Sequence, residues 1–222
     1  MSTAAAVTAV CVVAELHPEQ SNPDGLTGID KRPVGRAVPV GPYGLGGDLV
    51  KDYRHHGGLA QAVYAYADED AARWSEDLGV EIRPGMFGEN LRTNGVDLNS
   101  VEVGRRLRIG ASGLELELTS PRIPCATFAR RMAKFGVPER GWVKRFTQHG
   151  VSGAYFAVIS TGDVATSDTI ELGPSPGHGV TLGEMFTGGP EVFARLLHAE
   201  DDGRITLQEK VRDHARRAAA RG

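Results

Sequence analysis

Short apolar segments alternate with polar, glycine-rich stretches over most of the chain, and this pattern predicts many short strands. Residues 7–15 are rich in valine and predict the first strand. In residues 114–118 three leucines alternate with two glutamates, so one face of that strand is expected to be buried and the other hydrated. Further strands are expected at residues 37–40, 62–66, 105–110, 153–161 and 168–172, whereas residues 18–36 and 162–167 resemble a loop and a turn.

Helical spacing is found at residues 68–79, 126–136, 139–150, 190–201 and 206–222. The first of these helices is expected to have Asp68 as its N-cap and Gly79 as its C-terminal stop. In the second, Phe128, Met132 and Phe135 fall on one face. The sum predicts a mainly β fold, a barrel or a sandwich, with a few short helices. We expect this domain to span residues 1–175 and a small helical extension to span residues 176–222.

Composition and charge narrow the classes of protein. The chain has 222 residues, 41% of them apolar, which suits a packed globular protein. A formal net charge of −3 gives no basic field for nucleic acid, and no stretch approaches the ~20 apolar residues of a membrane span. The two cysteines form no disulfide framework, and no lysine or arginine precedes the apolar N-terminus as in a secretory signal. A reducing, cytoplasmic location is therefore expected.

The glycine-rich stretch at residues 46–58 contains a cluster of carboxylates and imidazoles. Asp48, Asp52, His55 and His56 lie within nine residues of one another. Such side chains suit a cation or a polar substrate, because the neighbouring glycines let a ligand approach the main chain closely. The spacing matches no zinc motif, and a solvated loop is the structural alternative.

Two further groups are candidates for binding. Glu89 and Asn90 stand in GMFGENL, where Glu89 is either an acid/base or hydrogen-bonding group facing a pocket, or part of a tight turn. Lys31 and Arg32 suit phosphate or another oxyanion, because arginine can bind these groups through two parallel hydrogen bonds. The strand with Arg105, Arg106 and Arg108 has the same chemistry, although a solvent-exposed strand explains it equally well.

Cys125 has a chemical context that Cys11 lacks. Arg122 precedes Cys125 by three residues, and a predicted helix begins directly after it. A cation and a helix N-terminus both favour the thiolate form, and Pro121 and Pro124 make the approach to it rigid. A reactive thiol and a small buried side chain both remain open for Cys125. Cys11 lies among valines and alanines and is expected to be buried and inert.

Taken in order, the motifs TGIDKRPV, GLGGDLVKDYRHHGG, PGMFGENL, VGRRLRIG and TSPRIPC resemble the MOSC domain family, in particular its stand-alone bacterial YiiM-like type. The family is named after the C-terminal domain of molybdenum cofactor sulfurases, and the resemblance runs from about Val7 to the end of the chain. It implies a MOSC-type β-barrel with a small helical C-terminal extension. The family's cysteine, which carries a persulfide or ligates molybdenum, falls on Cys125. Its polar pocket positions fall on Asp48, Asp52, His56, Glu89, Asn90 and Arg122. One departure is Arg105, which stands where relatives commonly have an acid.

The resemblance implies a reductase of N-hydroxylated compounds, such as bases similar to 6-hydroxylaminopurine, with a bound molybdenum cofactor. Cys125 would ligate molybdenum, and Glu89 or His56 would relay protons. The expected cofactor-binding residues are Arg122, Asn90, Asp48, Asp52, Lys31 and Arg32. No dinucleotide fingerprint and no iron–sulfur cysteine set occurs, so no resident flavin, NAD or iron–sulfur cluster is expected, and electrons would come from a donor protein.

Two alternatives remain open. Cys125 could instead be a sulfur carrier that receives a persulfide from a separate cysteine desulfurase or works with a cofactor-delivery protein. A divalent-metal hydrolase built on Asp48, Asp52 and His56 would keep its activity without Cys125. Neither nucleic acid nor a membrane is expected as a partner, and the pattern leaves open whether the chain forms a homodimer.

Overall fold

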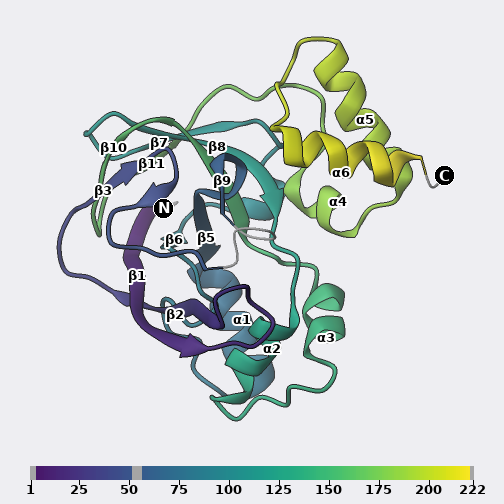
Figure 1. Ribbon diagram of the computed structural model, residues 1–222. Helices are drawn as coiled ribbons and strands as arrows, with labels where there is room; N and C mark the ends of the chain where they lie inside the picture. The colour runs from purple at the N-terminus through teal and green to yellow at the C-terminus, as the bar shows by residue number, and fades with distance from the viewer. Residues whose placement is uncertain (1–3, 52–56, 221–222) are drawn as a thin grey trace.

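The computed structural model describes residues 4–51 and 57–220, and its framework is one mixed sheet flanked by helices (Figure 1). The order of its eight strands is β11-β7-β8-β9-β5-β6-β1-β2. Their bounds are β1 Ala6–Pro18, β2 Leu26–Pro33, β5 Val63–Ala67, β6 Leu91–Asn94, β7 Arg106–Ile109, β8 Leu114–Pro121, β9 Ala154–Ser160 and β11 Ile170–Leu172. A small sheet has the order β10-β3-β4, with β10 at Gly162–Val164, β3 at Val38–Gly41 and β4 at Gly44–Leu45.

The described strands do not close into a barrel. Strands β11 and β2 form the two edges of the large sheet, and all its pairs are antiparallel except β5 with β6. The start of β1 reaches back toward β11 through an isolated bridge between Ala6 and Thr169. The expected barrel is therefore not confirmed, and the fold is a mixed, sheet-dominated one with several helices.

Strand β2 lies inside residues 18–36, where a loop is predicted, so that prediction is wrong. The strand pairs with β1 in antiparallel register, with Lys31 opposite Val13. Glycine and charged residues hide the strand pattern in the sequence, because apolar alternation is the main signal of a strand. The buried charges of Asp30 and Lys31 are compensated by ion pairs instead of by apolar packing. The predicted turn at residues 162–167 likewise contains β10, which pairs with β3.

The predicted helices are confirmed. Figure 1 shows the helices of the fold in two groups. The first group is α1 (Asp68–Leu78), α2 (Ala126–Ala133) and α3 (Trp142–His149), and the second is α4 (Leu182–Thr187), α5 (Pro190–Asp201) and α6 (Glu209–Ala219). Gly79 ends α1 in the left-handed conformation as expected, but the N-cap is Ala67 and not Asp68. Helix α4 is not predicted, although Thr181 and Glu184 form a capping box at its start.

Two apolar cores follow from this layout. The larger core joins the inner face of the sheet to α4, α5 and α6. The smaller core lies among α1, α2 and α3 and is mostly aromatic, with Trp74, Phe87, Phe128, Trp142 and Phe146 all buried. In the described part of the chain, no helix combines the length and apolar character needed to cross a membrane. Two short 3-10 helices, Leu59–Gln61 and Leu98–Ser100, complete the fold.

Candidate functional site

A pocket of about 110 Å³ lies between the start of α2, strand β2 and the segment that follows β4. The predicted site residues that line it are Lys31, Asp48, Asn90, Arg122 and Cys125. They come from segments far apart in the sequence, so the fold brings together what the motifs only suggested. Lys51 and Gly57 also line the pocket. Asp52, His55 and His56 lie outside the described residues.

Cys125 occupies the N-cap position of α2, with extended backbone (φ −134°, ψ 172°). Its carbonyl accepts a hydrogen bond from the Ala129 amide at 3.1 Å, which begins the helix. The thiol is free and partly exposed. By contrast, Cys11 is fully buried in β1, and burial raises the pKa of its thiol to about 12, with a further contribution from Glu89. Of the two cysteines, Cys125 is the one placed to react.

Arg122 is buried beside Cys125, with only 5% of its surface exposed. It donates a hydrogen bond from Nη1 to the Phe87 carbonyl, and its guanidinium carbon lies 4.0 Å from the centre of the Phe128 ring. The Nε atom is buried and has no hydrogen-bond partner among the described residues. Burial lowers the pKa of Arg122, but the phenols of Tyr64 and Tyr155 and the Cys125 thiol outweigh it, so the net pKa is raised. The pocket therefore has a fixed cation with an unsatisfied donor.

Lys31, Asp48 and Asn90 form a second polar group of the pocket. Lys31 Nζ lies 2.6 Å from Asp48 Oδ2, and Asn90 Nδ2 donates to the same oxygen at 2.8 Å. The other Asp48 oxygen accepts the Val13 amide at 3.0 Å. Because an ammonium group and an amide already bind this carboxylate, it is a poor ligand for a divalent cation. That arrangement weakens the case for a metal hydrolase built on Asp48.

The GMFGEN motif is a tight turn that packs against β2. Gly85 has φ +83°, and a Cβ atom there would lie 2.3 Å from the Lys31 carbonyl oxygen. Gly88 has φ +77°, and a Cβ there would lie 3.1 Å from Ile29 Cγ1. Only glycine fits this close approach together with a positive φ. The two glycines thus let the turn pack closely against β2, which forms the Lys31 side of the pocket.

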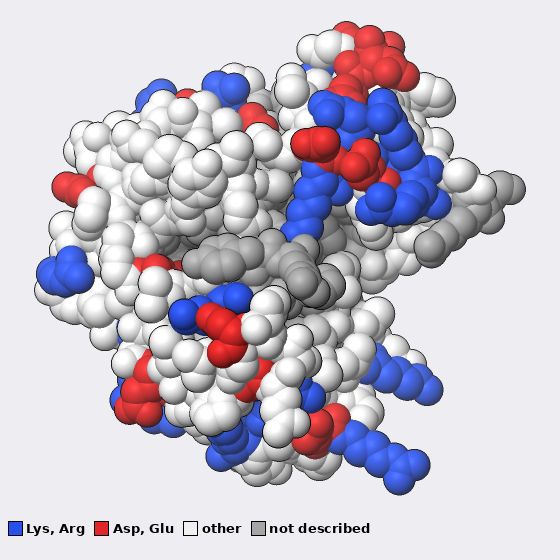
Figure 2. All heavy atoms as spheres, viewed as in Figure 1, with Lys and Arg blue, Asp and Glu red and all other residues white. Residues whose placement is uncertain are grey.

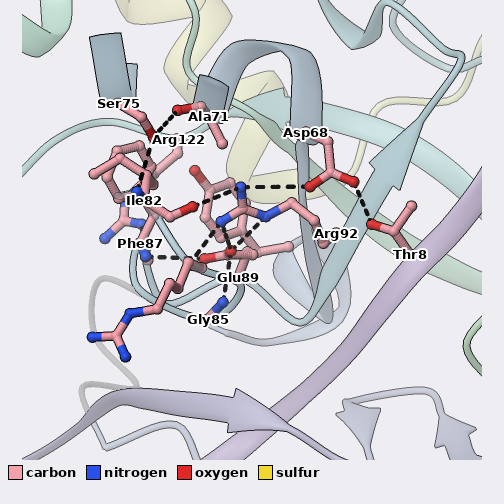
Figure 3. Close-up of polar contacts among 12 residues, drawn as sticks. Thr8, Asp68, Ala71, Ser75, Ile82, Gly85, Phe87, Glu89, Arg92 and Arg122 are labelled. Atoms are coloured by element: carbon pink, nitrogen blue, oxygen red, sulfur yellow. Dashed lines mark hydrogen bonds and ion pairs between the residues drawn. The ribbon is translucent and has the colours of Figure 1, made fainter. Parts of the chain in front are cut away.

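Glu89 is fully buried, and its carboxylate is directed toward Arg92 and the backbone of Gly85 and Phe87 (Figure 3). Its carboxylate accepts the amides of Gly85 at 2.7 Å and Phe87 at 3.0 Å, and it forms a fully buried ion pair with Arg92, at 2.5 Å. Arg92 also lies 3.8 Å from Asp68 in α1. Glu89 does not line the pocket. The structure therefore places it where it holds the turn, and its expected role in proton transfer stays a prediction.

Arg32 is not part of the pocket. Its side chain is 58% exposed and bonds to Glu15 at 3.3 Å and Asp30 at 2.9 Å. Because successive residues of a strand point to opposite faces, Lys31 and Arg32 separate, and only Lys31 faces the site. The arginines near β7 are also paired: Arg106 with Glu117, Arg108 with Glu171, and Arg105 with the Gly173 carbonyl. This agrees with an exposed strand whose charges are matched across the sheet.

The lining residues that are not predicted from the sequence include Tyr64, Tyr155 and Gln61. The Tyr64 hydroxyl donates to the Ser152 carbonyl at 2.7 Å, and its ring lies 5.0 Å from that of Tyr155. Burial raises the pKa of both phenols, so they stay neutral. Both tyrosines belong to apolar strand patterns, where an aromatic residue is expected for packing alone. No signal in a single sequence distinguishes them from core residues.

A groove of about 220 Å³ adjoins the pocket and shares Gln61 and Tyr155 with it. Helix α6 forms one side of the groove with Lys210, His214 and Arg217. Figure 2 shows basic side chains, interspersed with carboxylates, over α5 and α6. A ligand larger than the pocket could extend along this side.

The chain is similar to known proteins in both sequence and fold. Residues 52–171 match the family model described as the MOSC domain. The uncharacterized protein YflK of Bacillus subtilis is 32% identical over 85% of this chain and 78% of its own length. A protein named reductase from Gibberella moniliformis is 32% identical over 53% of this chain, which is 20% of its own length. The crystal structure of YiiM from Geobacillus stearothermophilus has a TM-score of 0.75 at 21% identity, over 97% of this chain and 99% of that one.

Proposed function

Because the chain belongs to the MOSC domain family, we propose that it binds a molybdenum cofactor and reduces N-hydroxylated compounds, with Cys125 as the protein ligand of molybdenum. The observation that carries this proposal is the Cys125 thiol beside the buried cation Arg122 in one pocket. The likeness to a protein named reductase supports redox chemistry, although this chain matches only a fifth of that protein.

The residues of the pocket fit such a cofactor. A thiolate is a soft metal ligand, and its assignment to molybdenum rests on the family. The cofactor is also an anion through its phosphate, and the unpartnered Nε of Arg122 and the Lys31 ammonium are suitable donors for it. Asn90 and Asp48 hold Lys31 in place through the shared Asp48 carboxylate. When bound, the cofactor would supply the two-electron reduction at the metal.

The protein residues would orient the substrate and deliver protons. Breaking the N–O bond of a hydroxylamine takes two electrons and two protons and yields the amine and water. We assign proton delivery to His56, which lies outside the described residues. Glu89 receives a positioning role, since Arg92 and two backbone amides occupy its carboxylate. Electrons would come from a separate donor protein.

Molybdenum content tests the proposal directly. Wild type and Cys125→Ser would be expressed in a host that makes the cofactor and purified under reducing conditions, with Cys11→Ser as the matched control. We expect close to one molybdenum per chain in wild type and Cys11→Ser, and a loss of most of it in Cys125→Ser, because the thiolate is the only protein ligand proposed. Wild type that loaded with molybdenum would then reduce an N-hydroxylated base when electrons are supplied.

The contrary result identifies the alternative. If wild type holds no molybdenum, the proposal of a resident cofactor fails. A mass increase of one sulfur atom on Cys125 would then support the sulfur-carrier function, for which a partly exposed thiol at a helix start is equally suited.

A further inference from the structure

We infer that two ion pairs between α2 and the β1–β2 hairpin position Cys125 in the pocket, so that Arg130, Arg131, Glu19 and Asp30 are positioning residues of the site. Helix α2 begins at Cys125 and carries both arginines. Both acids belong to the β1–β2 hairpin. The inference rests on the proposed function only in taking Cys125 as the reactive group.

The first ion pair is buried. Arg131 Nη2 lies 2.7 Å from Asp30 Oδ1, and the two side chains are 8% and 4% exposed. The second Asp30 oxygen accepts Arg32 at 2.9 Å and lies 3.0 Å from His17 Nε2. Burial opposes ionisation of Asp30, but these partners outweigh it and lower its pKa to about 2. A charge pair removed from water in this way has one favourable geometry, so it fixes the register of the helix against the strand.

The second ion pair lies one residue earlier on the helix. Arg130 holds the Glu19 carboxylate with two hydrogen bonds, from Nε at 3.0 Å and from Nη2 at 2.6 Å. Glu19 is almost fully buried although it follows the end of β1. Two consecutive arginines thus bind two different parts of the hairpin, which restrains both the rotation and the translation of α2.

These contacts connect the two walls of the pocket. Asp30 and Lys31 are neighbours in β2: Asp30 binds the helix that begins at Cys125, and Lys31 faces the pocket. Phe128, three residues before Arg131 and next to it on the helix surface, packs under Arg122 at 4.0 Å. The helix therefore contacts both the hairpin and the buried cation. Its first residue, Cys125, is fixed relative to Lys31 and Arg122 at the same time.

The test measures how strongly the cations of the pocket act on the Cys125 thiol. The full chain, made in a host without the cofactor, would react with iodoacetate, an anion, and with neutral iodoacetamide, and mass spectrometry would give both rates at Cys125. Nearby cations favour the anionic reagent, so the ratio of the two rates reports the position of the thiol. We expect the ratio to exceed that of the urea-unfolded chain in wild type, and to fall about fivefold in Arg131→Met and Asp30→Asn.

Matched variants distinguish a displaced Cys125 thiol from a general loss of stability. Arg212→Met removes a pair between α5 and α6, with Glu200, that is bidentate like Arg130–Glu19, and it should leave the ratio unchanged. Arg131→Lys keeps the charge and should recover most of the ratio. Cys11 is fully buried, so its resistance to both reagents marks a folded variant. If Arg131→Met does not fold, the exposed partner Arg130→Met gives the same test, since its guanidinium is 41% exposed.

An unchanged ratio in folded Arg130→Met and Arg131→Met would overturn the inference. So would an equal rise in both rates while Cys11 stays unmodified, because the thiol of a folded variant would then be more exposed but no farther from the cations. Neither outcome depends on molybdenum, so the inference and the proposed function can fail separately.

Discussion

At the scale of single residues, the site is set by which charges are paired and which are not. Arg122 has a buried nitrogen without a partner and faces the pocket, whereas Arg92 is satisfied by Glu89 and lies away from it. Both arginines are almost completely buried. A buried donor left unsatisfied is costly, and the Arg122 nitrogen differs from the equally unpaired Nε of Arg131 in that Arg122 lines the pocket beside Cys125.

Glu89 provides a prediction at this scale. Glu89→Gln should lower the free energy of unfolding by about 3–5 kcal/mol, because it leaves the fully buried Arg92 charge unpaired. Glu15→Gln is the control: its pair with Arg32 is 58% exposed on both sides and should contribute less than about 0.5 kcal/mol. Urea denaturation measures both. If the Glu89→Gln protein is as stable as wild type but inactive, the result would instead support a role of Glu89 in proton transfer.

Residue types and motif order predicted much of the site, and pairing within the fold decided the rest. Lys31, Asp48, Asn90, Arg122 and Cys125 were predicted and lie together. Arg32 was predicted on equal grounds, but the alternation of β2 turns it outward. Strand β2 itself was missed because its buried positions include Asp30 and Lys31, whose partners Arg131 and Asp48 are far away in sequence. Local patterns do not contain such partners.

At the scale of elements, helices α1 and α2 each combine an apolar face with buried charged groups. In α2 the arginines bind the β1–β2 hairpin, while Phe128 and Met132 enter the aromatic core. In α1 the buried Trp74 enters the same core, but Asp70 is buried near the start of the helix with only Arg73 as a partner, at 3.2 Å. Helix α1 thus includes a charge that the fold accommodates poorly.

Asp70 makes the stability of α1 depend on pH. Burial raises the pKa of Asp70 to about 6, with contributions from the carboxylates of Asp97 and Glu69 that outweigh Arg73. The folded state therefore binds the proton more tightly than the unfolded state, whose Asp pKa is about 3.9, and stability falls as pH rises from about 4 to 6. At pH 8, the free energy of unfolding of Asp70→Asn should exceed that of wild type by about 1–2 kcal/mol. This is less than the full pKa shift implies, because the charge of Asp70 also favours the helix N-terminus.

The measurement is urea denaturation at pH 4.5 and pH 8. The two proteins should differ little at the lower pH, where wild-type Asp70 is mostly protonated in the folded state. Glu76→Gln, an exposed change on the same helix, should alter stability at neither pH. An Asp70→Asn protein that is less stable than wild type at pH 8 would show that the helix N-terminus outweighs the cost of burial.

At the scale of the whole molecule, the hairpin and the helices are joined by carboxylates that acid would neutralise. Burial opposes the ionisation of Glu19 and Asp30, yet their arginine partners lower the pKa of each carboxyl to about 2. Their folded-state pKa values lie below the unfolded ones, so their contribution is complete above about pH 4 and is lost as pH falls toward 2.

We therefore expect the free energy of unfolding to decrease between pH 4 and pH 2, by about 1 kcal/mol for each of the two carboxylates after solvent screening. The double variant with Glu19→Gln and Asp30→Asn should be less stable at pH 6 and should lose less on acidification. Denaturation midpoints measured across this range give the comparison. Parallel curves for the two proteins would mean that other groups control the acid limb.

The bridge between Ala6 and Thr169 also has a consequence for how the chain is made. The amide of Val7 donates to the Asp168 carbonyl, so the first strand depends on a segment that the ribosome adds more than 150 residues later. At about 5–20 residues per second, that delay is on the order of ten to thirty seconds. During this interval the first residues of β1 lack a partner on the side that β6 does not cover. Nascent molecules, and not mature ones, would then be the form of this protein most dependent on chaperones.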